Sequence, residues 1–447
     1  MRRLRWALIA LSSLSLAGSR TLAYDLNIAG IPLIDAAIIA LLLASALWST
    51  RRHDLDRRIL LILTALAPVV LIATIESAGQ PNEQTLRLLM PFAVFGLALM
   101  PSRMAWQRSE LRWLLGLPVA IHLALNLLYL TINGLDPGST GIDQIRAVIF
   151  PDVSRADGLG LIYGFGMLAL LDIAAARSRP RASTAIAVVY LGIAGQVVWD
   201  HKALLLATAI CALLALTHGL FYRTTGERKL GTVAVAAVVV GFFAGPVLAS
   251  WQWPQSAPQA TPTTTQATPT TTQATPTAAT NSAGPLERFA IRGSETSRLD
   301  TWGDILRATD GPSRFLIGGN SSDTNLLLAA CGLSRTEYEQ SSSRNKCAVD
   351  NGLADFPLQF AHNWVFTSYL YFGIIGVASL LILLYLSLRD SAAVFRLTPT
   401  GAAPAVFWLI GLTSVMLWSP FVLIHAAVAM LAINSLARQT KVETPAK

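Results

Sequence analysis

SRLDTWGDILRATDGPSRFLIGGN, residues 297–320, and AHNWVFTSYLYFGIIG, residues 361–376, are the two stretches around which the rest of the chain is organised. The first is largely polar, and the second runs into a long apolar segment. Arg298 and His362 lie in these stretches, where a polar loop meets a predicted membrane helix. A guanidinium binds phosphate and an imidazole transfers protons near neutral pH. Together they indicate chemistry on a lipid-linked phosphate at a membrane surface.

The composition outside these stretches is that of a polytopic membrane protein. The chain has 447 residues, of which 53% are hydrophobic and 13% charged, and its mean hydropathy is +0.51. Soluble domains carry roughly 25% charged residues. The net charge of +8 does not indicate nucleic-acid binding, because positive charge beside membrane spans is a topology signal. The basic, then apolar amino terminus is interpreted as an uncleaved first helix.

Twelve apolar runs approach the length of about 20 residues that a bilayer requires. They lie near residues 5–22, 32–49, 59–76, 86–101, 113–132, 158–175, 184–200, 203–221, 231–250, 363–388, 403–418 and 419–437. An even number of spans places both termini on one side of the membrane. If that side is cytoplasmic, 21 of the 34 Lys and Arg residues fall in the termini and the short cytoplasmic connections, as the positive-inside rule requires.

The predicted architecture is therefore an all-α membrane protein with one large external loop between the ninth and tenth helices. The parts are nine helices in 1–250, the loop in 251–362, three helices in 363–437 and a cytoplasmic tail in 438–447. Within the loop, QATPT begins three times, at residues 259, 266 and 273. Repeats of this composition bury little apolar surface, so 254–285 is predicted to be a disordered spacer. Residues 297–362 are predicted to be ordered and helical.

A short helix is predicted near 297–309, because Leu299, Trp302 and Leu306 recur at helical spacing before a stop at Gly311-Pro312. Trp302 is four residues after Arg298 and shares its face, so the indole is expected to dock on the membrane surface and to orient the guanidinium.

His362 is the candidate catalytic residue, since it stands at the mouth of a span and is followed by Asn363. Gly373 and Gly376 form a G-x-x-G pair that lets a neighbouring helix approach and hold this end rigidly. Arg155, Lys202 and Arg298 are cations at the predicted outer boundary. If they converge, they bind a diphosphate and stabilise it as a leaving group; the alternative is that each snorkels separately to the interface.

The three cysteines do not indicate a metal site. Cys211 lies in an apolar span and is expected to be core, whereas Cys331 and Cys347 both fall in the external loop. An oxidising compartment allows a disulfide there, which closes a loop of about 15 residues and stabilises by about 3 kcal/mol. Without paired histidines these cysteines make no structural zinc site, and neither a metal nor a cofactor is expected.

The two opening stretches and the helical layout resemble the O-antigen ligase/polymerase superfamily of bacterial membrane glycosyltransferases. VSRADGLGLIYG at 153–164 is similar to the family's Arg-x-x-Gly segment before a span, and DHKALLLA at 200–207 to a second patch. Where the family usually has Ser-Arg or Thr-Arg, this chain has His201-Lys202. Lys202 keeps the positive charge at this position but cannot make the two parallel hydrogen bonds to phosphate that an arginine guanidinium makes.

The resemblance implies a GT-C-like fold in the bacterial inner membrane, with its active site on the periplasmic side. The donor is then a glycan on undecaprenyl diphosphate, and the acceptor is a sugar hydroxyl of lipid A-core. Arg298 and Lys202, with Arg155 as a third cation, contact the diphosphate, and His362 deprotonates the acceptor hydroxyl. Fixed cations replace a metal ion, and direct attack inverts the anomeric centre. Asn363, Trp302 and His201 are supporting residues, and membrane lipids surround the site.

Several alternatives remain open. Within the superfamily the acceptor is lipid A-core, another lipid-linked repeat unit in a polymerase, or a protein hydroxyl in an O-oligosaccharyltransferase. Outside it, a polytopic transporter is the main rival, with Asp35, His122 and Asp172 as its ionisable residues in the membrane. Core histidines that hydrogen-bond a neighbouring helix are the default interpretation of His122 and His425.

Overall fold

The computed structural model describes residues 2–17, 27–28, 31–50, 57–76, 83–102, 104–133, 156–176, 311–318, 363–412 and 420–443, with Trp302, Leu306 and separate residues between 210 and 221. The described part is almost wholly helical, which confirms the all-α prediction at that level. Its strands are β1 (Asn27–Ile28) and β2 (Ile31–Pro32), an antiparallel pair before the second helix. The predicted spacer, most of the external loop and the spans near 184–200 and 231–250 lie outside the described residues.

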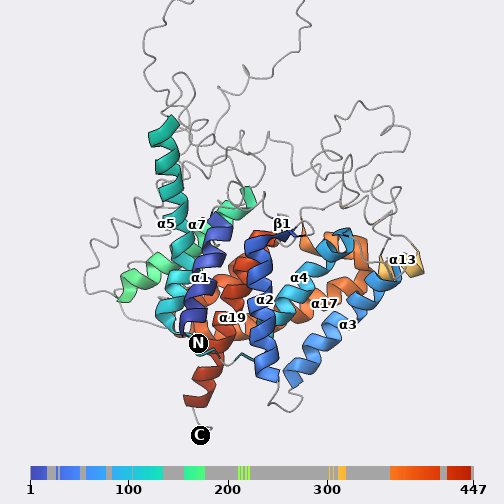
Figure 1. Ribbon diagram of the computed structural model, residues 1–447. Helices are drawn as coiled ribbons and strands as arrows, with labels where there is room; N and C mark the ends of the chain where they lie inside the picture. The colour runs from blue at the N-terminus through green and yellow to red at the C-terminus, as the bar shows by residue number, and fades with distance from the viewer. Residues whose placement is uncertain are drawn as a thin grey trace, which may run out of the picture.

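The first six predicted spans correspond to six helices, which Figure 1 shows packed side by side in one bundle. They are α1 (Arg2–Ala17), α2 (Leu33–Thr50), α3 (Arg57–Glu76), α4 (Glu83–Leu99), α5 (Arg108–Asn133) and α7 (Ala156–Ala176). The described carboxyl-terminal part adds α17 (Trp364–Phe395), the 3-10 helix η1 (Pro399–Ala402), α18 (Ala403–Gly411) and α19 (Pro420–Glu443).

Three helices of the described part are long and apolar enough to cross a membrane: Arg57–Ile75, Trp364–Phe395 and Val422–Thr440. Leu33–Leu47, Leu88–Leu99 and Leu161–Leu170 are shorter apolar helices. These lengths and compositions indicate a membrane protein.

Helix α19 lies at the centre of the bundle, where it packs against α1, α4 and α17. Every residue from 422 to 437 is buried. Alanines at 426, 427, 429, 432 and 437 leave room for neighbouring backbones, since small side chains let membrane helices approach closely.

Helix α17 does not run straight. Gly373 has φ 58° and ψ −154°, which interrupts the helical path. Trp364 Nε1 donates to the Trp408 carbonyl at 3.2 Å, and Trp408 Nε1 donates to Ser387 Oγ at 2.9 Å. In a straight helix residues 364 and 387 would be about 34 Å apart, too far to share one partner. The nine residues before Gly373 therefore turn back toward the rest of α17.

This turn corrects the span predicted at 363–388. All 32 residues of α17 in a straight helix would measure about 48 Å, against a bilayer core of about 30 Å. The part after Gly373 is the length of a span, and the part before it is a short additional helix. Helix α18 covers the first part of the span predicted at 403–418, and residues 413–418 lie outside the described residues.

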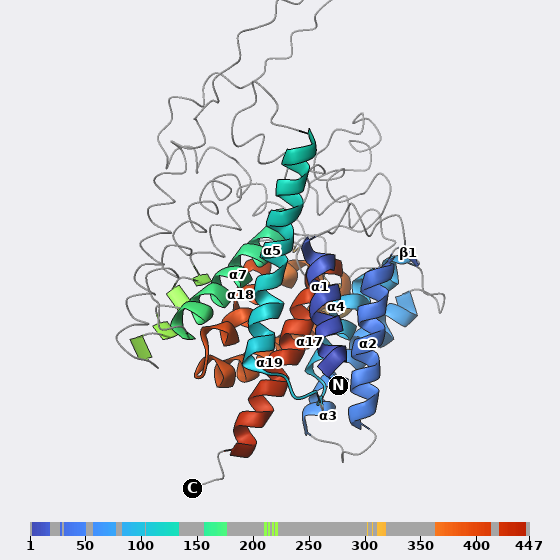
Figure 2. The same ribbon diagram turned by 60° about the vertical axis from the view of Figure 1, so that its left-hand side comes forward.

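The start of α1 and the end of α19 lie at the same end of the bundle in both views (Figures 1 and 2). We call this the terminal end. Arg5 of α1 and Glu110 near the start of α5 make an ion pair there, and Gln439 of α19 donates to the Trp106 carbonyl at 3.2 Å.

Candidate functional site

Ring contacts join the two sequence stretches that frame the external loop. Trp302, from the first stretch, stacks on Phe366 of α17, with ring centroids 4.9 Å apart and planes inclined by 12°. Phe315 of α13 (Pro312–Ile317) meets Tyr369 edge to face at 6.2 Å. Such aromatic pairs contribute about 0.5–1.5 kcal/mol beyond the area they bury. Two segments some sixty residues apart in sequence are therefore held against one face of α17.

Two glycines bring the backbones of these stretches into direct contact. A Cβ atom at Gly373 would lie 2.5 Å from the Leu316 carbonyl oxygen and 2.7 Å from Gly318 N. Gly318 in turn faces the backbone of Tyr371, Phe372 and Gly373. Both glycines have positive φ, 79° at Gly318 and 58° at Gly373. Residues with a side chain rarely adopt this backbone conformation. The motif glycines in FLIGG and FGIIG thus pack on each other.

The G-x-x-G pair does allow a neighbouring helix to approach closely. That helix is α13, whose end contacts Gly373. At Gly376, a Cβ atom would lie 2.9 Å from Ser368 Oγ and 3.0 Å from the Ser368 carbonyl oxygen, both on α17 before the turn. The absence of a side chain at Gly376 therefore accommodates the fold-back of α17 itself.

Asn363 fixes the start of α17. Its side-chain oxygen accepts hydrogen bonds from Val365 N at 2.8 Å and Phe366 N at 3.4 Å, which caps the helix. Its Nδ2 donates to the Leu412 carbonyl at 2.9 Å, just beyond α18. Asn363 is buried, so both halves of the amide are satisfied and the helix start is tied to a second helix.

The predicted catalytic and phosphate-binding residues lie outside the described residues. These are His362, Arg298, Lys202, Arg155 and His201, as well as the cysteines Cys331 and Cys347. Trp302 is described, and its stacking partner is Phe366. Phe366 is four residues after His362, and Trp302 is four residues after Arg298. The Trp302–Phe366 contact therefore joins a residue one helical turn after Arg298 to a residue one helical turn after His362 in the sequence.

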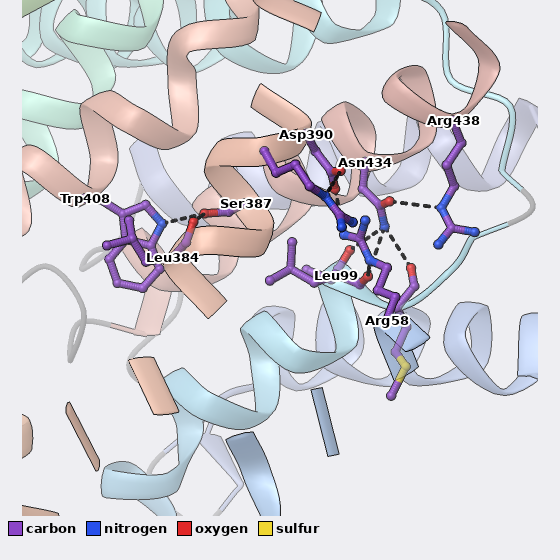
Figure 3. A network of polar contacts seen from close by, with 11 residues as sticks. Arg58, Leu99, Leu384, Ser387, Asp390, Trp408, Asn434 and Arg438 are labelled. Carbon is purple, nitrogen blue, oxygen red and sulfur yellow. Dashed lines mark hydrogen bonds and ion pairs between the residues drawn. The ribbon is translucent and has the colours of Figure 1, made fainter. Parts of the chain in front are cut away.

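The described core contains charged residues that form ion pairs with one another. The sequence pattern did not predict these pairs. Arg58 Nη2 and Asp390 Oδ2 are 2.6 Å apart, and Arg58 Nε donates to the Leu99 carbonyl at 2.7 Å (Figure 3). Asn434 Nδ2 donates to the Met100 carbonyl at 2.8 Å, and Arg438 Nε donates to Asn434 Oδ1 at 3.2 Å. This network, like Arg5–Glu110, ties helices together at the terminal end.

Asp172, one of the residues considered for transport, is also paired. It accepts from Arg112 Nε and is buried between α5 and α7. A buried carboxylate paired with an arginine in this way is accounted for as a structural ion pair.

The histidine and cysteine predictions have mixed outcomes. Cys211 is free and buried, as expected, and donates to the Gly164 carbonyl. His122 and His425 are buried as expected. His122 of α5 hydrogen-bonds the backbone of Ala17 on α1, as predicted, and its Nε2 has no partner. His425 lies against the backbone of Ser12 on α1, but neither of its ring nitrogens has a hydrogen bond of good geometry. Among the described residues, no three His, Cys, Asp or Glu side chains group as metal ligands.

No protein-family model and no curated protein matches this chain. The resemblance to the O-antigen ligase/polymerase superfamily therefore rests on the motifs in residues 153–164, 200–207, 297–320 and 361–376.

Proposed function

We propose that this chain is a membrane glycosyltransferase similar to the O-antigen ligases. It moves a glycan from undecaprenyl diphosphate to a sugar hydroxyl of lipid A-core on the periplasmic side of the bacterial inner membrane. The observation that carries the proposal is the joining of the 297–320 and 361–376 stretches through Trp302–Phe366 and Gly318–Gly373. The candidate phosphate ligand Arg298 and the candidate base His362 belong to these two stretches.

In this proposal the acceptor hydroxyl oxygen attacks the anomeric carbon of the donor glycan. The new glycosidic bond forms as the bond from the anomeric carbon to the diphosphate oxygen breaks, and undecaprenyl diphosphate leaves. His362 takes the hydroxyl proton, a role suited to an imidazole that titrates near neutral pH. Arg298, Lys202 and Arg155 neutralise the charge that develops on the departing diphosphate. One displacement inverts the anomeric configuration.

The described contacts support this assignment through positioning. A buried asparagine cap, a stacked aromatic pair and two mutually packed glycines restrict motion at the start of α17. Catalysis by orientation requires such rigid support, because displacement of a reacting group by about 1 Å can cost a factor of about 100 in rate. Polymerases and O-oligosaccharyltransferases of the same superfamily would use the same chemistry on another acceptor. The identity of the glycosylated product therefore distinguishes these three activities.

The test is the lipopolysaccharide banding pattern of a deletion strain complemented with wild type, His362→Ala or Arg298→Ala. Matched controls are His53→Ala, a histidine in the predicted cytoplasmic turn, and Arg396→Ala, an exposed arginine at the end of α17. Membrane levels of each variant are measured by immunoblot, so that loss of protein is separated from loss of activity.

A ligase predicts that His362→Ala and Arg298→Ala lose all polymer on lipid A-core while long lipid-linked polymer accumulates, and that both controls keep the wild-type ladder. Lipid A-core with a single repeat unit would identify a polymerase instead. An unchanged ladder in the deletion strain would reject transfer to lipopolysaccharide.

A further inference from the structure

Asp35 differs from the other buried acids of the described part. Glu110 pairs with Arg5, Asp172 with Arg112 and Asp390 with Arg58. Asp35 has no basic partner among the described residues, although none of its surface is exposed. Its Oδ1 accepts from Ser15 Oγ at 2.5 Å, and its Oδ2 has no hydrogen-bond partner.

The half of α1 that contacts Asp35 through Ser15 carries further polar groups that are short of hydrogen bonds. Ser13 Oγ, on the same segment of α1 as Ser15, is buried without a partner. His425 of α19 lies against the backbone of Ser12, one turn before Ser15, and neither of its ring nitrogens has a hydrogen bond of good geometry. His122 of α5 lies near the backbone of Ala17. Three titratable groups from three helices thus surround the second half of α1.

The charged groups on the helices packed against α2 do not supply a counter-ion in the described contacts. Asp35 is the one charged residue of α2, and β1 and β2 carry none. On α1 the arginines are in the first turn, where Arg5 is engaged by Glu110. On α19 the remaining described groups are His425 and Arg438. The side chains of Lys441 and Glu443 on α19, and of Glu83 and Arg87 on α4, lie outside the described residues.

An unpaired carboxylate inside a membrane bundle is too costly to persist as a bare charge. With no basic partner for Asp35 in the described part of the chain, a proton or a small cation is the neutralising group that we consider. Asp35 Oδ2 is free to hold such a cation, and the hydroxyl oxygen of Ser15 on the adjoining turn of α1 is a second oxygen ligand beside it. Carboxylate oxygens bind a proton, and carboxylate and hydroxyl oxygens together coordinate Na⁺. The ligand is therefore a monovalent cation in either case.

We propose that Asp35 is the centre of a monovalent-cation site within the bundle, occupied by a proton or by Na⁺. The site lies among α1, α2 and α19 and is distinct from the α13–α17 contact on which the proposed transfer function rests. Intramembrane carboxylates of this kind carry ions or protons in pumps and transporters. The protein therefore binds a cation independently of any glycan.

The test uses the full-length protein in a detergent without ester groups, because lipid esters absorb in the same infrared region, and it requires no glycan substrate. Infrared spectroscopy detects the carbonyl stretch of a protonated carboxyl group, which a carboxylate lacks. Spectra are recorded at neutral pH in choline chloride and in NaCl, for wild type, Asp35→Asn, Ser15→Ala and the paired-acid control Asp172→Asn. Thermal unfolding is measured in NaCl, KCl and choline chloride for the same four proteins.

If a proton occupies the site, the wild type shows a protonated-carboxyl band that Asp35→Asn loses, Ser15→Ala shifts and Asp172→Asn keeps. If Na⁺ occupies the site, the band is absent in NaCl, and NaCl raises the unfolding temperature of wild type but not of Asp35→Asn. The proposal is overturned if the wild type shows neither a band that depends on Asp35 nor a sodium-specific stabilisation.

Discussion

Replacement of Gly318 by alanine is expected to separate α13 from α17. The new Cβ atom would lie against the Tyr371 carbonyl carbon, 2.5 Å from Phe372 N and 2.7 Å from Gly373 N. Ordinary non-bonded contacts are about 3.5–4.0 Å, so the backbones must move apart by about 1 Å. The backbone itself, at φ 79° and ψ −165°, lies in a region that is essentially restricted to glycine and costs other residues about 1–3 kcal/mol.

Gly311→Ala is the matched control, because Gly311 flanks the same helix with φ 116° and has no neighbouring atom within 4 Å of the place that a Cβ atom would take. Both variants carry the backbone cost, but only Gly318→Ala displaces the contact with α17. The displacement also weakens the Phe315–Tyr369 pair, so Gly318→Ala is predicted to lose about 1 kcal/mol more stability than Gly311→Ala.

Two assays follow this prediction: thermal unfolding in detergent, and glycan transfer by the purified protein. A displacement of about 1 Å at a positioning contact is expected to lower transfer by about 100-fold, whereas Gly311→Ala should stay close to wild type in transfer. Equal stability and equal transfer in the two variants would refute the idea that the α13–α17 contact positions the site.

Three further predictions concern the described contacts. Asn363→Ala removes a cap and an interhelical hydrogen bond and should lower the free energy of unfolding by about 2 kcal/mol in mixed micelles, whereas Asn363→Asp keeps the cap. A double-mutant cycle of Trp302→Ala and Phe366→Ala should give a coupling energy of about 1 kcal/mol, and strictly additive effects would contradict the stacked pair. Arg58→Ala leaves Asp390 unpaired and should cost about 3–5 kcal/mol, with a smaller loss when both are replaced by apolar residues.

The apolar runs predict the described helices well because a spanning helix is specified by local composition. The first six runs correspond to α1 to α5 and α7 with small differences at their ends. Local signals are weaker where one residue type serves two purposes. Gly311-Pro312 indicates a helix stop, yet proline is also favoured in the first turn of a helix, and α13 begins at Pro312.

The turn in α17 and the pairing of charges depend on contacts that no local pattern encodes. Gly373 predicts a close approach, but its positive φ and its contact with Leu316 follow from tertiary packing. Arg58 and Asp390 are 332 residues apart in sequence and become partners only in the folded bundle. The serines of α1 at 12, 13 and 15, within an apolar helix, are the available signal for a polar region around Asp35.

The most direct test of the central proposal is glycan transfer by the purified chain in nanodiscs. The donor is a synthetic undecaprenyl-diphosphate-linked glycan, and the acceptor is lipid A-core. We predict that wild type forms glycosylated lipid A-core with one undecaprenyl diphosphate released per glycan, and that His362→Ala lowers the rate by about 100-fold or more. Absence of product from wild type, or an unchanged rate in His362→Ala, would contradict the proposed function and mechanism respectively.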